Sequence, residues 1–156
     1  MAKAEQEEGF NKAKSIVYRL LNIRLRSEHE LRAKLVSKKL PHSIVEQAIR
    51  YFRGLDLVND RQFARQWIAS RLKKPFGFNR IRLELTEKGI PAAVIQETLD
   101  EASKDYDEWT TAAQLAQHRA RKYRNIDADK VRRRLYGYLQ RRGFKTSTIV
   151  KVIRNI

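Results

Sequence analysis

A set of apolar residues that recurs about every 50 positions constrains the fold of this chain more than any other feature. The central copy covers residues 80–99 and contains two runs of helically spaced apolar residues. The first run ends at Lys88-Gly89, and the second begins at Pro91. Glycine ends a helix because it adopts the left-handed backbone conformation cheaply, and proline suits a first helical turn because the missing N–H has no partner there. The central copy therefore predicts a helix, a tight turn and a second helix.

The other two copies lie 50 residues before and 54 residues after the central one. The aligned positions are Leu31, Leu35, Leu40, Pro41, Ile44, Val45 and Ile49, then Ile81, Leu85, Gly89, Ile90, Pro91, Val94, Ile95 and Leu99, then Leu135, Leu139, Gly143, Phe144, Ile149 and Ile153. Two positions depart from the pattern, since Lys39 replaces the glycine and Thr146 stands near the place of the proline. A repeat of this length is typical of stacked helical modules, and three hairpins that look alike by chance are the alternative.

Composition agrees with an all-α protein. The 156 residues include only six glycines and three prolines, and no long run alternates valine or threonine with polar residues. Because there is no cysteine, disulfides and thiolate chemistry are excluded. No apolar run is long enough to span a membrane, and the first ten residues lack a signal region. We therefore expect a cytoplasmic protein without membrane association.

A further helix precedes each copy of the hairpin, which gives three helices per module. The sequence thus predicts an all-α protein of three tandem three-helix repeats in an elongated, curved array. The predicted repeats are residues 11–57, 58–104 and 105–156. The first helix is expected at residues 11–23, after a frayed tail over residues 1–10.

Three local signals indicate how helices begin. Ser27 and Glu30 have the spacing of a capping box, in which each side chain accepts from the backbone N–H of the other. Asp60 is a candidate N-cap for the first helix of the second repeat. The acidic stretch at residues 97–108 either solvates a hinge or caps the helix that begins near Trp109.

The charge of the chain points to a polyanionic partner or to an acidic protein surface. There are 34 Lys and Arg against 18 Asp and Glu, for a net charge of +16. The asymmetry is strongest at the C-terminal end, where 13 Lys and Arg face two Asp from Thr110 onward. A basic protein whose charges are only solvated is the alternative, because charge alone does not identify a partner.

Two basic clusters are candidates for binding nucleic acid or a protein filament. Aromatic rings beside lysines in the turn 73–78 could stack on bases or dock on a partner, or staple the next helix, whereas Phe63 and Trp67 are assigned to the core. In the last repeat, the arginines opposite the apolar stripe have almost no acids to pair with. The candidates are Lys73, Lys74, Arg121, Lys122, Lys130, Arg132, Arg133, Arg134, Arg141, Arg142 and Lys145.

No feature of the sequence indicates catalysis. Neither the phosphate loop G-x-x-x-x-G-K-[ST] nor the dinucleotide turn G-x-G-x-x-G occurs. The three histidines are isolated from other metal-ligand residue types. Glu84 and Glu87 share a basic helix, which favours ion pairs over a catalytic carboxylate pair. We expect no catalytic residue, no cofactor and no metal, and hence a protein that is not an enzyme.

Segments from all three repeats resemble the RecX family of bacterial regulatory proteins. They are residues 27–35, 55–64, 80–85, 88–90 and 139–144. The resemblance extends from about Ala13 to Ile153 and rests on the order and spacing of these segments. It implies three tandem three-helix repeats, no catalysis, binding to the RecA filament and some affinity for single- or double-stranded DNA. It also implies inhibition of RecA ATP hydrolysis, strand exchange and coprotease activity, and a place in DNA repair, homologous recombination and the SOS response.

We therefore expect a monomeric regulator that lies along a RecA–DNA filament. One alternative is a sequence-tolerant DNA- or RNA-binding protein that is built from helix-turn-helix-like units and acts without RecA. Another is a basic scaffold for an acidic protein. Binding that depends on RecA at physiological salt would separate the first hypothesis from the second.

Overall fold

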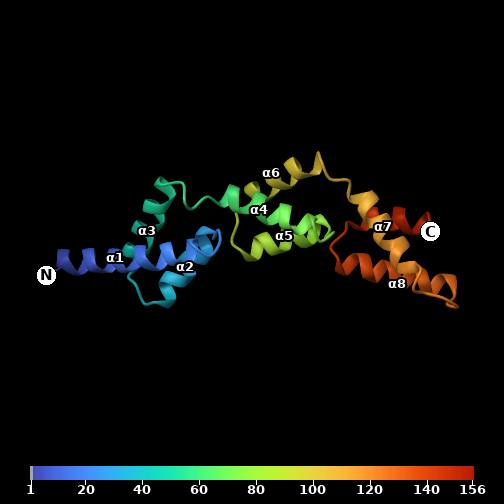
Figure 1. Cartoon of the computed structure of the whole chain (residues 1–156), viewed down its shortest axis with the longest axis horizontal. Coiled ribbons are helices and arrows are strands. Elements are labelled where there is room, and N and C mark those ends of the chain that lie inside the picture. The colour runs from blue at the N-terminus through green and yellow to red at the C-terminus, as the bar shows by residue number, and fades with distance from the viewer. Residues whose placement is uncertain (1) are drawn as a thin grey trace.

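The computed structural model describes residues 2–156, and every regular element in that range is an α-helix. The helices are α1 (Ala2–Leu21), α2 (Glu28–Ser37), α3 (His42–Gly54), α4 (Asp60–Leu72), α5 (Phe78–Glu87), α6 (Ala92–Ser103), α7 (Glu108–Ala120), α8 (Ala128–Arg141) and α9 (Thr146–Arg154). They form three groups along the long axis, with the termini at opposite ends (Figure 1). We call these groups repeat 1 (α1–α3), repeat 2 (α4–α6) and repeat 3 (α7–α9).

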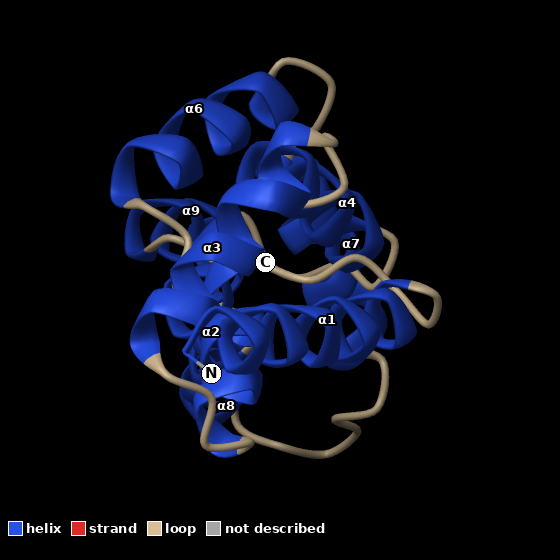
Figure 2. Ribbon diagram, turned by 90° about the vertical axis from the view of Figure 1, so that its left-hand side faces the viewer, coloured by secondary structure: helices blue, strands red, loops and turns tan. Residues whose placement is uncertain are grey.

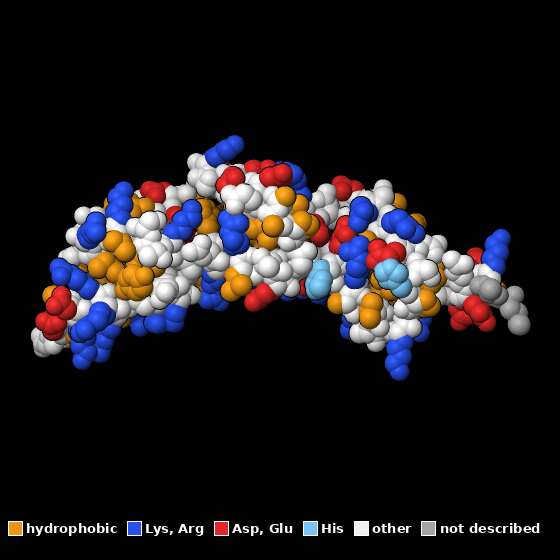
Figure 3. Space-filling view, turned by 180° about the vertical axis from the view of Figure 1, so that it is seen from behind, with side chains coloured by type: hydrophobic (Ala, Val, Ile, Leu, Met, Phe, Trp, Pro, Cys, Tyr) orange, Lys and Arg blue, Asp and Glu red, His pale blue; other side chains and the backbone are white. Residues whose placement is uncertain are grey.

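The overall shape is elongated and curved, as the sequence predicted. Seen along the long axis, the ribbon consists of helices and connecting loops (Figure 2). The space-filling view has an arched outline, with one convex and one concave edge (Figure 3). The prediction of three tandem three-helix repeats in a curved array is confirmed.

Each repeat has a hydrophobic core of its own, and the aligned apolar positions form it. The first and second leucine or isoleucine of each copy are fully buried: Leu31 and Leu35, Ile81 and Leu85, Leu135 and Leu139. Their spacing of four residues places both side chains on one face of the second helix of each repeat. Phe63 lies in the core of repeat 2 and Trp67 packs half-buried against it, as expected.

The turn after each second helix has the same backbone conformation in all three repeats. Gly89 and Gly143 have φ of 73° and 84°, as the sequence pattern predicts. Lys39, which replaces the glycine in repeat 1, also has a positive φ, of 58°. This conformation costs an L-residue about 1–3 kcal/mol. The repeat geometry therefore imposes the turn even where the residue does not favour it.

Helix α1 is longer than the sequence predicted. It begins at Ala2 and ends at Leu21. The predictions of a frayed tail over residues 1–10 and of a helix over residues 11–23 are therefore both wrong for the described residues. Met1 lies outside the described residues. Phe10 extends the helical packing, because its ring meets the Tyr51 ring edge-on at 5.6 Å. Residues 3–8 are mostly strong helix formers, and Glu5 lies in the first turn, where the helix dipole favours negative charge.

Of the helix caps suggested by the sequence, one is wrong. The capping box of Ser27 and Glu30 is present at the start of α2. Asp107, within the acidic stretch, caps α7, which confirms the capping alternative for that stretch. Asp60, however, is the first residue of α4, and Asn59 is its N-cap. Asp60 has a different role, at the contact between repeats.

Consecutive repeats meet through one recurring contact. The N-terminus of the second helix of one repeat packs against the C-terminal end of the second helix of the next. At the first junction, Ser27 Oγ donates to the Lys88 carbonyl oxygen at 2.7 Å. At the second, the Gly77 N–H donates to the Arg142 carbonyl oxygen at 2.8 Å. Because Ser27 aligns with Gly77 and Lys88 with Arg142, the array is built by repeating a single interface.

A carboxylate of the following repeat completes each junction. Asp60 Oδ1 accepts from the Glu28 N–H at 2.9 Å, and Glu108 Oε1 accepts from the Phe78 N–H at 2.9 Å. Both N–H groups lie in the first turn of a second helix, where no intrahelical partner is available. Burial raises the pKa of Asp60, and Glu108 is buried. The two junctions thus fix neighbouring repeats by backbone and carboxylate hydrogen bonds.

The second junction leaves no room for a side chain at Gly143. A Cβ there would lie 2.3 Å from Arg80 Cβ and 2.5 Å from Arg80 N, at a φ of +84°. We expect Gly143→Ala to destabilise the protein by about 1–3 kcal/mol through backbone strain. Gly54→Ala is the matched control, because a Cβ at Gly54 meets nothing within 4 Å. Thermal unfolding followed by circular dichroism should show a lower Tm only for Gly143→Ala, and equal melting of both variants would contradict a tight junction.

The first junction should make stability depend on pH through Glu30. Burial alone would raise its pKa, but hydrogen bonds from Arg24, Lys88 and the Ser27 N–H lower the pKa to about 2. Because the folded pKa is below the unfolded one, the ionised carboxylate stabilises the protein above about pH 4.5. That contribution is lost as the pH falls from about 4.5 towards about 2.

Urea unfolding across this pH range would test the prediction, with Glu30→Gln as the reference. Wild type should lose more stability than Glu30→Gln as the solution is acidified, since the amide does not titrate. Parallel losses in the two proteins would contradict a stabilising role for the ionised carboxylate.

Candidate nucleic-acid interface

The fold brings the two basic clusters of the sequence together. Lys73 and Lys74 are exposed at the end of α4, in the turn that leads to α5. This turn packs on the end of α8, where Arg142 Nη1 donates to the Lys74 carbonyl oxygen at 3.1 Å. The Arg142 guanidinium also lies 5.2 Å from the centre of the Phe76 ring. The turn and repeat 3 therefore form one continuous surface, although Lys74 and Arg142 are 68 residues apart in the chain.

Most of the remaining candidates are exposed on repeat 3. The exposed side chains are those of Arg121, Lys122, Lys130, Arg132, Arg133, Arg134, Arg141 and Lys145. Arg141 folds back over Gly137, because a Cβ at that glycine would meet Arg141 Nη1 at 3.1 Å. Arg142 is the exception among the candidates of repeat 3, since it is half-buried at the junction and has a structural role.

The positive charge of repeat 3 is largely uncompensated. The described residues form eleven ion pairs within 4.0 Å, and ten of them lie in repeats 1 and 2 or between them. Within residues 105–156 the single pair is Arg132 with Asp129, at 3.4 Å and exposed. Cations without a protein partner are available to bind phosphate groups, which release counterions when they are neutralised.

In repeat 2, by contrast, arginines of α4 are paired with acidic side chains of α6. Glu97 and Glu101 of α6 pair with Arg61 and Arg65 of α4. Figure 3 shows acidic side chains along the convex edge of the middle of the molecule, and basic side chains over its C-terminal end, at the left. Unpaired positive charge is therefore densest at the C-terminal end of the molecule, as the charge distribution of the sequence predicts.

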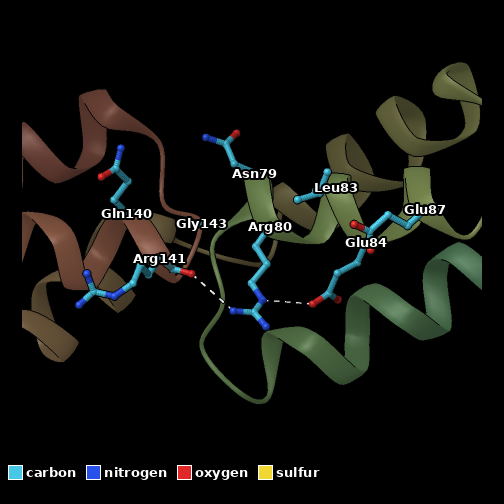
Figure 4. A pocket seen from close by; sticks show the side chains of 8 residues that line it. All are labelled: Asn79, Arg80, Leu83, Glu84, Glu87, Gln140, Arg141 and Gly143. Atoms are coloured by element: carbon cyan, nitrogen blue, oxygen red, sulfur yellow. Dashed lines mark hydrogen bonds and ion pairs between the residues drawn. The ribbon is translucent and has the colours of Figure 1, made fainter.

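A shallow hollow of about 440 Å³ lies beside the second junction, between α5 and the end of α8 (Figure 4). Arg80 crosses it, donating from Nε to Glu84 at 3.1 Å and from Nη1 to the Arg141 carbonyl oxygen at 3.4 Å. Glu84 also accepts from Trp67 Nε1 at 2.9 Å and from Arg71 Nε at 2.6 Å. Arg80 thus links the ion pairs of repeat 2 to the backbone of repeat 3, and the hollow lacks the enclosure of a small-molecule site.

The electrostatics of Glu84 follow from these contacts. Burial would raise its pKa, but hydrogen bonds from Trp67, Arg80 and Arg71 lower it. Glu84 therefore stays ionised and neutralises the arginines beside it. The prediction that Glu84 is an ion-pair partner is confirmed, whereas Glu87 forms no ion pair among the described residues.

Sequence reasoning missed several aromatic residues that lie among the arginines of repeat 3. The guanidinium of Arg119 lies 5.1 Å from the centre of the Tyr138 ring, and that of Arg134 lies 5.5 Å from the centre of the Tyr123 ring. The signal was present, because Arg119 and Tyr123 are four residues apart, as are Arg134 and Tyr138. Within a helix that spacing places two side chains on one face, as for Arg134 and Tyr138 of α8, whereas Tyr123 lies beyond the end of α7.

No group of three or more His, Cys, Asp or Glu in residues 2–156 is arranged to hold a metal ion. None of the helices described has the length and the apolar character needed to cross a bilayer.

Three family models match the chain in order. They are the first, second and third three-helix domains of RecX, at residues 13–52, 59–99 and 105–153. This chain belongs to the RecX family. One matched domain lies inside each predicted repeat, while the exact repeat boundaries stay predictions. The RecX family is not a known enzyme family.

Named relatives and solved structures agree with the family assignment. The regulatory protein RecX of Streptomyces coelicolor is 31% identical over 143 residues, which cover 91% of this chain and 76% of the relative. RecX of Chlorobium phaeobacteroides is 32% identical over 146 residues and 93% of each chain. The crystal structure of RecX from Lactobacillus salivarius superposes with a TM-score of 0.86 at 21% identity, over 96% of this chain and 97% of that chain. The structural match supports the fold, and the family models and relatives support membership.

Proposed function

We propose that this protein binds the RecA–DNA filament and inhibits the ATPase, strand-exchange and coprotease activities of RecA. Membership of the RecX family, a family of RecA regulators, is the observation that carries the proposal. The protein acts as a monomer, with no catalytic residue or cofactor of its own. Its effect comes from binding, so it depends on shape and surface rather than on reactive groups.

The arrangement of the repeats supports contact with a polymer. Three repeats joined by the same interface place similar three-helix units one after another along the long axis (Figure 1). A helical filament also presents the same surface at regular intervals. Because contacts on one rigid body raise each other's effective concentration, several weak contacts can give strong overall binding.

Repeat 3 supplies affinity for DNA in this proposal. Its cations lack carboxylate partners apart from Arg132, so phosphate binding breaks few existing ion pairs. The proposed contact residues are Lys73, Lys74, Arg121, Lys122, Lys130, Arg132, Arg133, Arg134, Arg141, Arg142 and Lys145. Phosphate contacts carry no sequence information, which suits a protein that acts along a filament of any sequence.

A second function, sequence-tolerant binding of DNA or RNA without RecA, is favoured by the many cations of repeat 3 that have no acidic partner. The two proposals differ in what the protein recognises at physiological salt. Fluorescence anisotropy of labelled oligo(dT), with and without saturating RecA and a non-hydrolysable ATP analogue, separates them. The filament proposal requires much tighter binding to the RecA-coated strand, and equal or weaker binding to it would contradict the proposal.

Charge reversal on α8 should weaken DNA binding and lower its salt dependence. If about six phosphates are contacted, log K on single strands falls with log salt at a slope of about −4. Replacing Arg132, Arg133 and Arg134 with Glu should flatten this slope and weaken binding to every sequence. The control reverses Lys12, Arg19 and Lys38, three exposed cations of repeat 1, and changes the net charge equally. Equal affinities of the two triple variants would place the DNA site elsewhere.

A further inference from the structure

A line of alternating aromatic rings and arginines crosses from repeat 2 into repeat 3. Each guanidinium carbon along it lies between 4.7 and 5.9 Å from the centre of a neighbouring ring. In order, its members are Trp67, Arg71, Phe76, Arg142, Tyr138, Arg119, Tyr123 and Arg134. Four separate segments contribute to the line, so it is a product of the tertiary fold and not of one helix.

The two ends of this line differ in charge. At the repeat 2 end, Arg71 and Trp67 both donate to Glu84, so the charge is neutralised and the side chains are held in place. At the repeat 3 end, Arg119 Nε donates to the Tyr123 hydroxyl at 3.3 Å, and no carboxylate lies within ion-pair distance of Arg119 or Arg134 among the described residues. A guanidinium has five N–H donors, most of which stay available here.

The aromatic rings at the repeat 3 end are accessible in part. Tyr123 lies just beyond α7 and Tyr138 on α8, and both are half-buried. Arg134 ends the line and has a ring, that of Tyr123, on one side only, so a flat base placed on its other side extends the alternating series. Lys130 and Arg133 are exposed on the same helix as Arg134, and their charges are available to phosphate groups.

We infer that the cluster of Tyr123, Tyr138, Arg119, Arg134 and Arg142 is a stacking site for the bases of single-stranded nucleic acid. The inference rests on the proposed DNA binding of repeat 3 and names the strand type that this surface prefers. In a duplex the base faces are already stacked on one another, so they are not available to a protein ring or guanidinium. Single strands offer both phosphates and free base faces. Stacking therefore adds affinity for single strands alone.

Substitution of both tyrosines in the full chain tests the site. Tyr123→Leu with Tyr138→Leu keeps apolar bulk but removes the π faces, and Tyr123→Phe with Tyr138→Phe restores them without the hydroxyls. Tyr18→Leu, at an exposed tyrosine of repeat 1, is the matched control. Fluorescence anisotropy would measure binding to oligo(dT) and to a duplex of equal length at the same salt. Circular dichroism would first establish that each variant is folded.

The double leucine variant should lose about tenfold or more of its affinity for oligo(dT), since each stacked base contributes that order of effect. Its duplex affinity and its salt slope should stay near those of wild type, because the phosphate contacts remain. The double phenylalanine variant should regain most of the lost affinity. Equal losses on oligo(dT) and duplex would overturn the inference, as would unchanged DNA affinity with weaker binding to the RecA filament, which would make the cluster a protein contact.

Photo-crosslinking of the wild-type protein gives a second readout that does not depend on a variant. Oligo(dT) that contains bromodeoxyuridine should crosslink to the peptides carrying Tyr123 or Tyr138, and crosslinks confined to other peptides would overturn the inference. Failure of the proposed function looks different, because a wild-type protein that bound neither DNA nor filament would leave no crosslink at all.

Discussion

A fragment of residues 1–107 is expected to inhibit RecA at least about tenfold less well than the full chain. The fragment lacks repeat 3 and with it most of the uncompensated charge. Losing one of three linked contacts lowers the effective concentration of the others, an effect that reaches about 10²–10⁴ in linked systems. Its loss of DNA affinity should be larger than its loss of inhibition, because the proposed DNA contacts lie mainly in the part removed.

The end point of the fragment follows from packing in repeat 2. Tyr106 packs against the core of that repeat, with its ring 5.4 Å from the Phe78 ring, so the fragment must retain it. Circular dichroism would establish that two repeats stay helical, and the concentration that halves RecA ATPase would then be compared with that of the full chain. Full inhibition by the folded fragment would contradict the three-contact account and would leave repeat 3 as a DNA tether.

Leu85→Ala and Leu139→Ala should each destabilise the protein by about 2–5 kcal/mol. Both side chains are fully buried at equivalent positions, so each substitution leaves a cavity in the core of its own repeat. Leu83→Ala is a matched control on the same helix as Leu85, because that side chain is 59% exposed and its truncation should change stability by less than about 0.5 kcal/mol.

Tryptophan fluorescence during urea unfolding can locate these effects. Trp67 reports on repeat 2 and Trp109 on repeat 3, so Trp→Phe at one of them leaves a reporter in the other repeat. Separate cores joined by nearest-neighbour interfaces should make each leucine truncation act most strongly on its own repeat. Wild-type unfolding midpoints in both leucine variants would contradict the core assignment.

The parts of the fold that the sequence predicts correctly are those decided by local spacing. Leu85 and Gly89 illustrate this, since an apolar residue one turn before a left-handed glycine defines both the buried face and the end of a helix. The extension of α1 was missed because it depends on Phe10 meeting Tyr51, from a helix that follows much later in the chain. Asp60 was misassigned because its partner, the Glu28 N–H, lies in the preceding repeat.

The candidate interface was predictable in composition but not in arrangement. The excess of cations identifies repeat 3, yet only the fold shows that Arg142 holds the turn that carries Lys74. Charge counting also overlooks neutral residues, and so it passed over Tyr123 and Tyr138, which lie between the arginines. The distances between side chains in the folded protein decide which cations remain unpaired. These distances cannot be read from a list of charged residues.

RecA ATP hydrolysis on single-stranded DNA, with the full chain titrated in at physiological salt, tests the central claim most directly. The DNA should be in excess over both proteins, so that sequestering free strands cannot by itself lower the rate. Hydrolysis is expected to fall as the protein is added, and further DNA should not restore it. Unchanged hydrolysis while the protein is bound to the DNA, or full recovery when more DNA is added, would contradict regulation through the filament.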